Sequence, residues 1–221
     1  MMFRLVGNLP LQDIWVACSG GPDSMCVLDF LKSHPKRKLK VAFFHHGTEA
    51  STEAYAFVSD YAARNNLPFS MKRLTTEKPV EISPEEHWRN ERYAFLHSLP
   101  GTVVLGHHLD DVIETYIFSM LNGAKRLIPY RNKNCIRPFL YSRKQHLLDW
   151  CNDKGVPHLH DKSNDDVRYA RNRIRRNIVP EALKINPGLH KVVTRLLEAK
   201  LAEDMPLTEE ALVYPEQEYV L

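Results

Sequence analysis

Short apolar runs and helical patterns alternate along the first 121 residues, and this alternation limits the fold more than any other feature. Four runs have the length and composition of buried strands: residues 13–18, 39–45, 69–74 and 102–106. Helical periodicity or a helix-start signal follows each run, at residues 25–31, 51–65, 83–98 and 110–121. Because strands that alternate with helices form parallel crossovers, the pattern predicts an α/β fold with an open, doubly wound, mostly parallel sheet.

Local signals add detail to these helices. Ser51 is expected to open the second helix, while Ser83 as N-cap and Pro84 in the first turn open the third. The fourth helix is expected to face the core with one apolar stripe, made of Ile113, Tyr116, Ile117, Met120 and Leu121. Further helices are predicted at 142–153 and 180–201, as a helical C-terminal extension.

The chain length of 221 residues suits one substantial domain with a small appendage. We expect a catalytic domain over residues 1–189 and a short helix with an acidic tail over 190–221. The four cysteines include no CxxC pair, and the N-terminus has no apolar signal-peptide core. No apolar stretch approaches the length of a membrane span. These features together predict a cytoplasmic protein without a membrane segment.

Basic residues are concentrated in two segments, although the net charge is only +3. Residues 124–144 contain seven Lys or Arg and no acidic residue, and residues 161–177 contain six basic against three acidic residues. A solvated protein face is the simplest explanation of one such segment. Two of them favour a phosphate-rich partner such as nucleic acid.

A candidate phosphate loop, Ser19-Gly20-Gly21-Pro22-Asp23-Ser24, lies between the first strand and the first helix. The glycines let the backbone approach a phosphate, and the amides at a helix N-terminus attract anions. Ser19 and Ser24 add hydroxyl donors, and Asp23 is placed to hold Mg²⁺. The chain has no GxxxxGK[ST] sequence, which excludes a Walker-type loop. A plain strand-to-helix turn is the alternative.

A second polar group follows the fourth strand, in the sequence His107-His108-Leu109-Asp110-Asp111-Val112-Ile113-Glu114. Its three carboxylates share the first turn and a half of one helix. Acidic residues also complement the helix dipole, which explains one of them without any function. The full group, beside two histidines at the carboxyl end of a strand, favours binding of Mg²⁺, of a substrate ammonium, or of both.

A third group lies downstream, with Arg137 in IRPFL and a polar stretch that begins at His160. Asp161 and Ser163 are residue types that often cap helices locally. The arginines that follow are typical of a solvated helix face. The spacing of Arg168, Arg171 and Arg175 could equally align three guanidinium groups along a phosphate backbone.

These motifs occur in the order SGGPDS, FFHHG, WRNERY, GHHLDDVIET, IRPFL and DKSNDD followed by RNRIR. In that order they resemble the bacterial-type tRNA(Ile)-lysidine synthetase family, within the PP-loop ATP-pyrophosphatases, over about residues 13–190. The resemblance implies a ligase that adenylates the wobble cytidine of a CAU-anticodon isoleucine tRNA with ATP and Mg²⁺. Free L-lysine then displaces AMP. Family members normally continue into C-terminal tRNA-binding domains, so the resemblance implies a minimal form here, which would rely on a homodimer or on its own basic segments to bind tRNA.

The resemblance also assigns roles to residues of this chain. The implied catalytic residues are Asp23, His107, Asp111 and Glu114, with Asp23 also the metal ligand. The implied cofactor-binding residues are Ser19, Gly20, Gly21, Pro22, Asp23, Ser24, His46 and Gly106. The implied binding residues for lysine and tRNA are Arg89, Asp110, Asp111, Glu114, Arg137, Asp161, Ser163, Asn164, Arg168, Arg171, Asn172 and Arg175.

Two alternatives remain open from the sequence. Another PP-loop activity, such as tRNA thiolation or amidation of a small acid, would share the phosphate loop. The missing CxxC pairs and the DKSN and RNRIR segments argue against it. A non-catalytic tRNA-binding relative would have no need of the intact SGGxDS and HHLDDxxET motifs.

Overall fold

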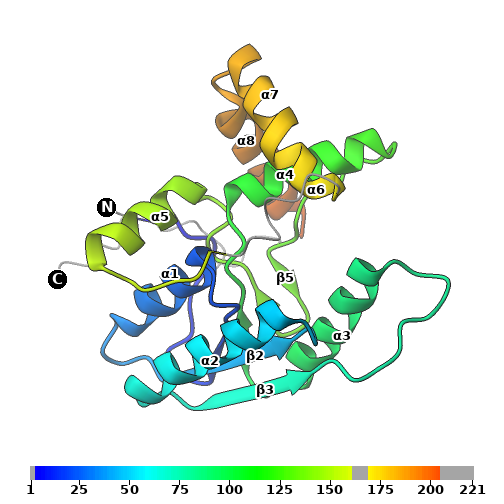
Figure 1. The fold of residues 1–221 in the computed structure, drawn as a ribbon. Coiled ribbons are helices and arrows are strands. Elements are labelled where there is room, and N and C mark those ends of the chain that lie inside the picture. Colours follow the sequence, from blue (N-terminus) through cyan, green and yellow to red (C-terminus); the bar gives the residue numbers. More distant parts are fainter. Residues whose placement is uncertain (1–2, 161–168, 205–221) are drawn as a thin grey trace.

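The computed structural model describes residues 3–160 and 169–204 and contains a six-stranded sheet in the order β3-β2-β1-β4-β6-β5 (Figure 1). The strands are β1 (Ile14–Ala17), β2 (Leu39–His45), β3 (Phe69–Arg73), β4 (Thr102–Val104), β5 (Arg131–Asn132) and β6 (Cys135–Ile136). Every pair is parallel except β5 with β6. The predicted open, mostly parallel α/β sheet is therefore confirmed.

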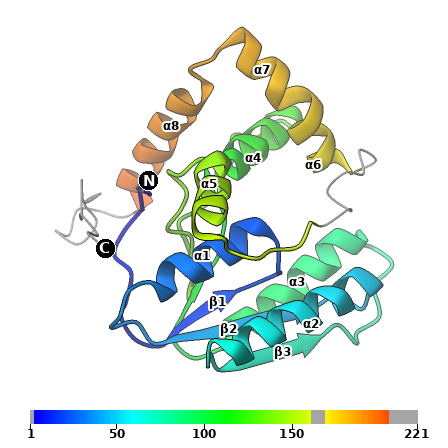
Figure 2. The same cartoon turned by 60° about the vertical axis from the view of Figure 1, so that its left-hand side comes forward.

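Helices cover both faces of this sheet and extend beyond it at the C-terminal end. They are α1 (Pro22–Lys32), α2 (Glu49–Arg64), α3 (Pro84–Ser98), α4 (Leu109–Leu121), α5 (Lys144–Lys154), α6 (Ala170–Arg173), α7 (Val179–Ile185) and α8 (Leu189–Asp204). A π-helical turn, Ile174–Ile178, joins α6 to α7. Figure 1 shows α4, α7 and α8 gathered away from β2 and β3, and Figure 2 shows α5 beside α1.

Two hydrophobic clusters, one on each face, follow from the alternation of side chains along the strands. Ile14 and Val16 of β1 point into the larger cluster, which also contains the buried sides of α1 and α5. Trp15 points into the smaller cluster, where α3 contributes Leu96. Helix α1 is buried on most of its surface, and its predicted core residues Met25, Val27, Leu28 and Leu31 are all fully buried. The strand carrying the phosphate loop is thus fixed from both sides.

The ends of two helices differ from the sequence-based expectation. Helix α2 begins at Glu49, and its N-cap is Thr48, whose hydroxyl accepts from the Ser51 amide at 3.2 Å, so Ser51 lies inside the first turn. By contrast, Ser83 caps α3 as predicted, accepting from the Glu86 amide at 3.1 Å. Because Thr and Ser both serve as N-caps, residue type alone does not distinguish Thr48 from Ser51 as the start of α2.

The single helix predicted over residues 180–201 is wrong, because the structure has α7 and α8 with a break between them. Pro187 disfavours the helical conformation of the residue before it, and Asn186 is accordingly extended, at φ −133° and ψ 94°. The Asn186 side chain accepts a hydrogen bond from the Gly188 amide at 2.9 Å, which opens the next helix. This break allows α8 to turn back onto α4.

The apolar stripe predicted for α4 is also partly wrong. Ile113 is fully buried as expected, but Met120 and Leu121 are 45% and 67% exposed. The far end of α4 projects away from the sheet (Figure 1), so its apolar side chains have no core to enter. Only the first turns of α4 pack firmly, and these turns carry the polar group that follows β4.

The order of the strands places the polar loops together. Strands β1 and β4 are parallel neighbours, while β1 also pairs with β2 on its other side. The connections from β1 and β4 therefore diverge at their carboxyl ends, which is the position where open α/β sheets bind ligands. Within residues 3–160 and 169–204, no helix combines the length and apolar character needed to cross a bilayer.

Candidate functional site

The loop after β1 has the geometry of an anion-binding turn. Gly20 has φ +85°, a conformation that side chains disfavour, and its carbonyl accepts from the Leu159 amide at 2.8 Å. Gly21 is the N-cap of α1, with no side chain capping the helix, and Pro22 follows in the first turn. The first-turn amides of α1 therefore remain available to a phosphate.

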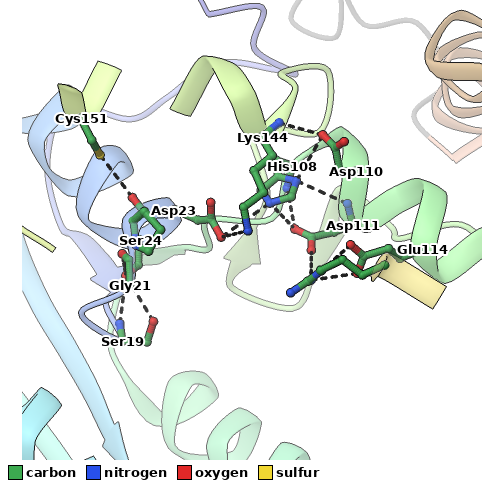
Figure 3. A network of polar contacts seen from close by, with 12 residues as sticks. Ser19, Gly21, Asp23, Ser24, His108, Asp110, Asp111, Glu114, Lys144 and Cys151 are labelled. Atoms are coloured by element: carbon green, nitrogen blue, oxygen red, sulfur yellow. Dashed lines mark hydrogen bonds and ion pairs between the residues drawn. The ribbon is translucent and has the colours of Figure 1, made fainter. Parts of the chain in front are cut away.

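The Ser24 hydroxyl organises this loop from inside (Figure 3). It accepts from the Ser19 amide at 3.1 Å and donates to the Gly21 carbonyl at 3.0 Å. The Ser19 hydroxyl lies 3.3 Å away from it. Because Ser24 is almost fully buried, these contacts hold the loop in one conformation before any ligand arrives.

Replacing Ser24 with alanine should therefore raise the KM for ATP about tenfold, with a stability loss of about 1 kcal/mol. Ser33, the C-cap of the same helix, is the matched control, since its hydroxyl donates to the Phe30 carbonyl at 2.7 Å, at the end away from the loop. Ser33→Ala should cost similar stability and leave the KM unchanged. Steady-state kinetics and thermal melts of both variants would show whether Ser24 acts on the loop.

Asp23 projects from the first turn of α1 toward the segment that follows β4. Its Oδ2 lies 3.6 Å from His108 Nε2 and 3.7 Å from Lys144 Nζ, whereas its buried Oδ1 has no hydrogen-bond partner among the described residues. Burial alone would raise the pKa of Asp23, but the contact with His108 and the charge of Lys144 lower it below the usual range. Asp23 is thus an ionised carboxylate with one oxygen left for a ligand.

His108 lies at the centre of the polar group, although of the two adjacent histidines only His107 was assigned a catalytic role from the sequence. It is fully buried, caps α4, and forms a reciprocal box with Asp111, whose Oδ2 accepts from the His108 amide at 3.0 Å. Burial opposes its charge, but Asp111, Asp23 and Asp110 raise its pKa to about 9. A protonated His108 ring donates from both nitrogens, so the 3.4 Å contact from the Asp111 amide to its Nδ1 is a hydrogen bond only when the ring is neutral.

Glu114 and Arg175 form a bidentate ion pair one turn further along α4. Arg175 Nε lies 2.6 Å from Glu114 Oε1, and Nη2 lies 2.8 Å from Oε2. The same Nη2 lies 3.5 Å from Asp111 Oδ1. Burial raises the pKa of Glu114 despite the opposing effect of Arg175, and the pair raises the pKa of Arg175. The two carboxylates expected to meet an amine therefore already hold a cation of the chain.

Asp110 joins three elements at the border of this group. Its Oδ2 accepts from the Lys144 amide at 2.7 Å, at the start of α5, and its Oδ1 lies 3.1 Å from His190 Nε2 of α8. Burial would raise the pKa of Asp110, but the bonds from His190 and the Lys144 amide lower it to about 2. Both carboxylate oxygens of Asp110 thus have partners within the chain. Asp110 therefore has a structural role in addition to the substrate contact predicted from the sequence.

Cationic side chains gather on the other side of the loop after β4. Arg137 is 2% exposed, and its terminal nitrogens donate to the Pro129 carbonyl at 2.8 Å and the Tyr93 hydroxyl at 2.7 Å. Arg89 is exposed and lies over the Tyr93 ring, 5.4 Å from its centroid. Burial and the charges of Arg137 and Arg92 hold the pKa of His107 well below its usual value. His107 is therefore neutral at pH 7 and, unlike His108, does not contact Asp23 in this arrangement.

The remaining predicted site residues fall into four groups. Gly106 packs against the phosphate loop, where an added Cβ would lie 3.3 Å from the backbone of Asp23. The His46 ring packs on Phe44 and Trp88, with centroids 5.0 Å and 5.6 Å apart. Arg171 is exposed and Asn172 half-buried on α6, but Arg175 turns inward. Asp161, Ser163, Asn164 and Arg168 lie outside the described residues.

The residues present fit a nucleotide with a divalent cation. The uncapped first turn of α1 suits a phosphate, and the partnerless Oδ1 of Asp23 suits a hard cation. Among the described residues, no group of three or more His, Cys, Asp or Glu could hold a metal ion by itself. Phosphate and water oxygens would complete the coordination of a Mg²⁺ ion at Asp23.

The chain is similar to several known proteins. The family model for the PP-loop domain matches residues 2–182. The protein named tRNA(Ile)-lysidine synthase from Thermotoga sp. (strain RQ2) is 32% identical over 202 residues, covering 84% of this chain and 49% of the relative. The protein of the same name from Geobacter sulfurreducens is 33% identical, covering 96% of this chain and 48% of the relative. The chain spans about half the length of these curated relatives.

Among solved structures, the U34-tRNA thiolase NcsA from Methanococcus maripaludis has a similar fold, with a TM-score of 0.72. The match covers 90% of this chain and 74% of the thiolase, at 16% sequence identity. At that identity the likeness concerns the fold alone. The matched family model includes the loop after β1 and the residues that follow β4.

Proposed function

The chain belongs to the PP-loop domain family, and on that basis we propose that it ligates lysine to a tRNA base at the expense of ATP. The reacting position is C2 of the wobble cytidine in a CAU-anticodon isoleucine tRNA. The first step adenylates the C2 oxygen and releases pyrophosphate. In the second, the ε-amine of free lysine attacks C2, and AMP leaves with that oxygen.

One observation carries the proposal: the phosphate loop and the acidic first turns of α4 meet at Asp23. The Asp23 carboxylate lies 3.6 Å from His108, and His108 lies 3.4 Å from Asp111. The loop that we propose for phosphate and the carboxylates that we propose for an amine are therefore close together (Figure 3). Similarity to proteins named tRNA(Ile)-lysidine synthase supports this choice among PP-loop activities.

The residues near the loop suit the adenylation step. The α1 amides would bind phosphate oxygens, and Mg²⁺ bound at Asp23 would offset negative charge on the phosphates. Lys144 Nζ lies 3.7 Å from Asp23 Oδ2 and adds a positive charge beside the loop. A fixed site of this kind lowers the barrier because its dipoles need not reorganise during the reaction.

The carboxylates of α4 suit the second step. A lysine ammonium must lose a proton before its nitrogen can attack, so it needs a nearby carboxylate that orients it and accepts the proton. Asp111 and Glu114 are such groups, and the Arg175 guanidinium now occupies them. Binding of lysine there requires Arg175 to share or release this contact. Arg89, exposed near Tyr93, is our candidate for the α-carboxylate of lysine.

The position at which ATP is cleaved tests the class of reaction. With tRNA and lysine present, ATP labelled at the α-phosphate should yield AMP, and ATP labelled at the γ-phosphate should yield pyrophosphate. Omission of the tRNA should remove both products, since the base is the group adenylated. ADP and inorganic phosphate as products would contradict the proposal. So would AMP formation that proceeds without RNA.

A further inference from the structure

A cavity of about 310 Å³ lies apart from the phosphate loop, between α8, the start of α5 and the N-terminal segment. Figure 2 shows α8 beside the N-terminal segment, and the Ser142 hydroxyl donates to the Arg4 carbonyl at 3.1 Å. We name this cavity the α8 pocket. Its polar lining includes Arg4, Arg143, His190, Lys191, Arg195 and Glu198.

The α8 pocket has a strong excess of positive charge. Its lining contains four Lys or Arg side chains and one carboxylate, Glu198. Glu198 pairs with Arg4 at 2.7 Å, and the Arg4 guanidinium also lies over the Tyr141 ring at 4.6 Å. Within the part of the chain that the structure describes, Arg143, Lys191 and Arg195 have no carboxylate partner. Three cations thus face one cavity without compensation, which costs stability through mutual repulsion unless an anion binds.

The positions of these cations favour a polyanion that arrives from solvent. Lys191 and Arg195 are one helical turn apart on α8, and both are exposed, as is Arg143 before α5. Exposed cations on separate elements match the spaced phosphates of a nucleic-acid backbone, to which Lys and Arg bind through charge and hydrogen bonds. A single small anion would be expected to have a more enclosed site with buried donors.

Hydrogen bonds also connect the α8 pocket to the candidate active site. His190 lines the pocket and bonds through Nε2 to Asp110 Oδ1 at 3.1 Å. Asp110 in turn caps α5 and lies in the group around His108. From this arrangement we infer that the α8 pocket binds a backbone phosphate of the RNA, and so positions the strand relative to the phosphate loop. This inference rests on the proposed tRNA function and assigns RNA contacts to α8.

The test compares tRNA binding by Lys191→Ala and Arg195→Ala with binding by the native chain over a series of KCl concentrations. Each variant should weaken binding about threefold to tenfold at low salt, and lower the slope of log K against log salt by about one. Lys200→Ala is the matched control. It removes one cation from the same helix outside the pocket, where Lys200 pairs with Asp204 at 2.7 Å. The control should bind tRNA with the native slope.

Unchanged slopes in both pocket variants, with native melting temperatures, would overturn the inference. A calorimetric titration with inorganic phosphate identifies the other source of an anion. If the native chain binds phosphate, the variants do not, and tRNA binding is equal in all, the pocket serves a free anion and the RNA assignment is wrong. Because the readout is RNA binding, it is separate from catalysis. If the native chain transferred no lysine, but the pocket variants still had a lower salt slope than the native chain, the proposed reaction would be wrong and the RNA contact would stand.

Discussion

Asp23→Asn should lower tRNA-dependent ATP–pyrophosphate exchange by about 100-fold to 1000-fold, the range for removing one preorganised electrostatic group. Asparagine keeps the shape of the side chain but removes its charge, which Mg²⁺ binding requires. The carboxylate is the only acidic side chain of the loop, and its Oδ1 has no hydrogen-bond partner among the described residues. The measurement is exchange of labelled pyrophosphate into ATP at saturating tRNA.

Asp29→Asn is the control, because Asp29 lies on the same helix and has structural partners. It accepts from Trp150 Nε1 at 3.0 Å and pairs with Lys32 at 3.5 Å. This variant should lose a little stability and keep native exchange. Equal exchange by the two variants, whether both active or both inactive with intact folds, would contradict the role given to Asp23.

Arg175→Ala should lower the free energy of unfolding by about 2–3 kcal/mol, and the Tm by about 5–10 °C. The substitution leaves the buried carboxylate of Glu114 without its bidentate partner, and the side chain of Glu114 is only 6% exposed. We expect less than the full cost of a deeply buried pair, because the Arg175 side chain is 31% exposed. Chemical denaturation of the native chain and the variant measures the difference.

The loss should depend on pH in a definite direction. Without Arg175, the pKa of Glu114 in the folded chain rises further above its ordinary value of 4.5. A group with a raised folded pKa stabilises the fold below its unfolded pKa, and this contribution is lost as the pH rises through the folded value. The destabilisation should therefore be larger at pH 8 than at pH 5.

An exposed ion pair provides the comparison for this experiment. Arg64 and Asp60 lie 3.0 Å apart on α2, with side chains 77% and 56% exposed. Arg64→Ala should change stability by well under about 1 kcal/mol, with no such pH dependence. If Arg175→Ala had an equally small effect, the contact with Glu114 would not be a stabilising part of the native site.

Sequence reasoning predicted the fold well where periodicity was long, and failed where elements were short. The four strands predicted from apolar runs and the helices between them are present. Strands β5 and β6 contain two residues each, too few for an alternating pattern to be recognised. The break at Asn186 was readable in principle, since Pro187 and Gly188 directly follow it.

In the candidate site, the direction in which each side chain points could not be predicted from the sequence. Two adjacent histidines look alike in a sequence, but the start of α4 turns His108 toward the carboxylates and leaves His107 near Arg137. The spacing of Arg171 and Arg175 suggested one exposed face. In the structure Arg175 lies in the π-helical turn Ile174–Ile178, which packs on α4, and its guanidinium contacts Glu114. The capping pattern of His108 with Asp111 was a signal that could have identified the first case.

The most direct test of the proposed activity is incorporation of labelled lysine into a CAU-anticodon isoleucine tRNA in the presence of ATP and Mg²⁺. The same transcript with uridine at the wobble position serves as the control substrate. We predict one lysine per tRNA, in the wobble nucleoside as identified by mass spectrometry, and none in the control. A chain that binds this tRNA and cleaves ATP to AMP, yet transfers sulfur from a donor and no lysine, would contradict the account.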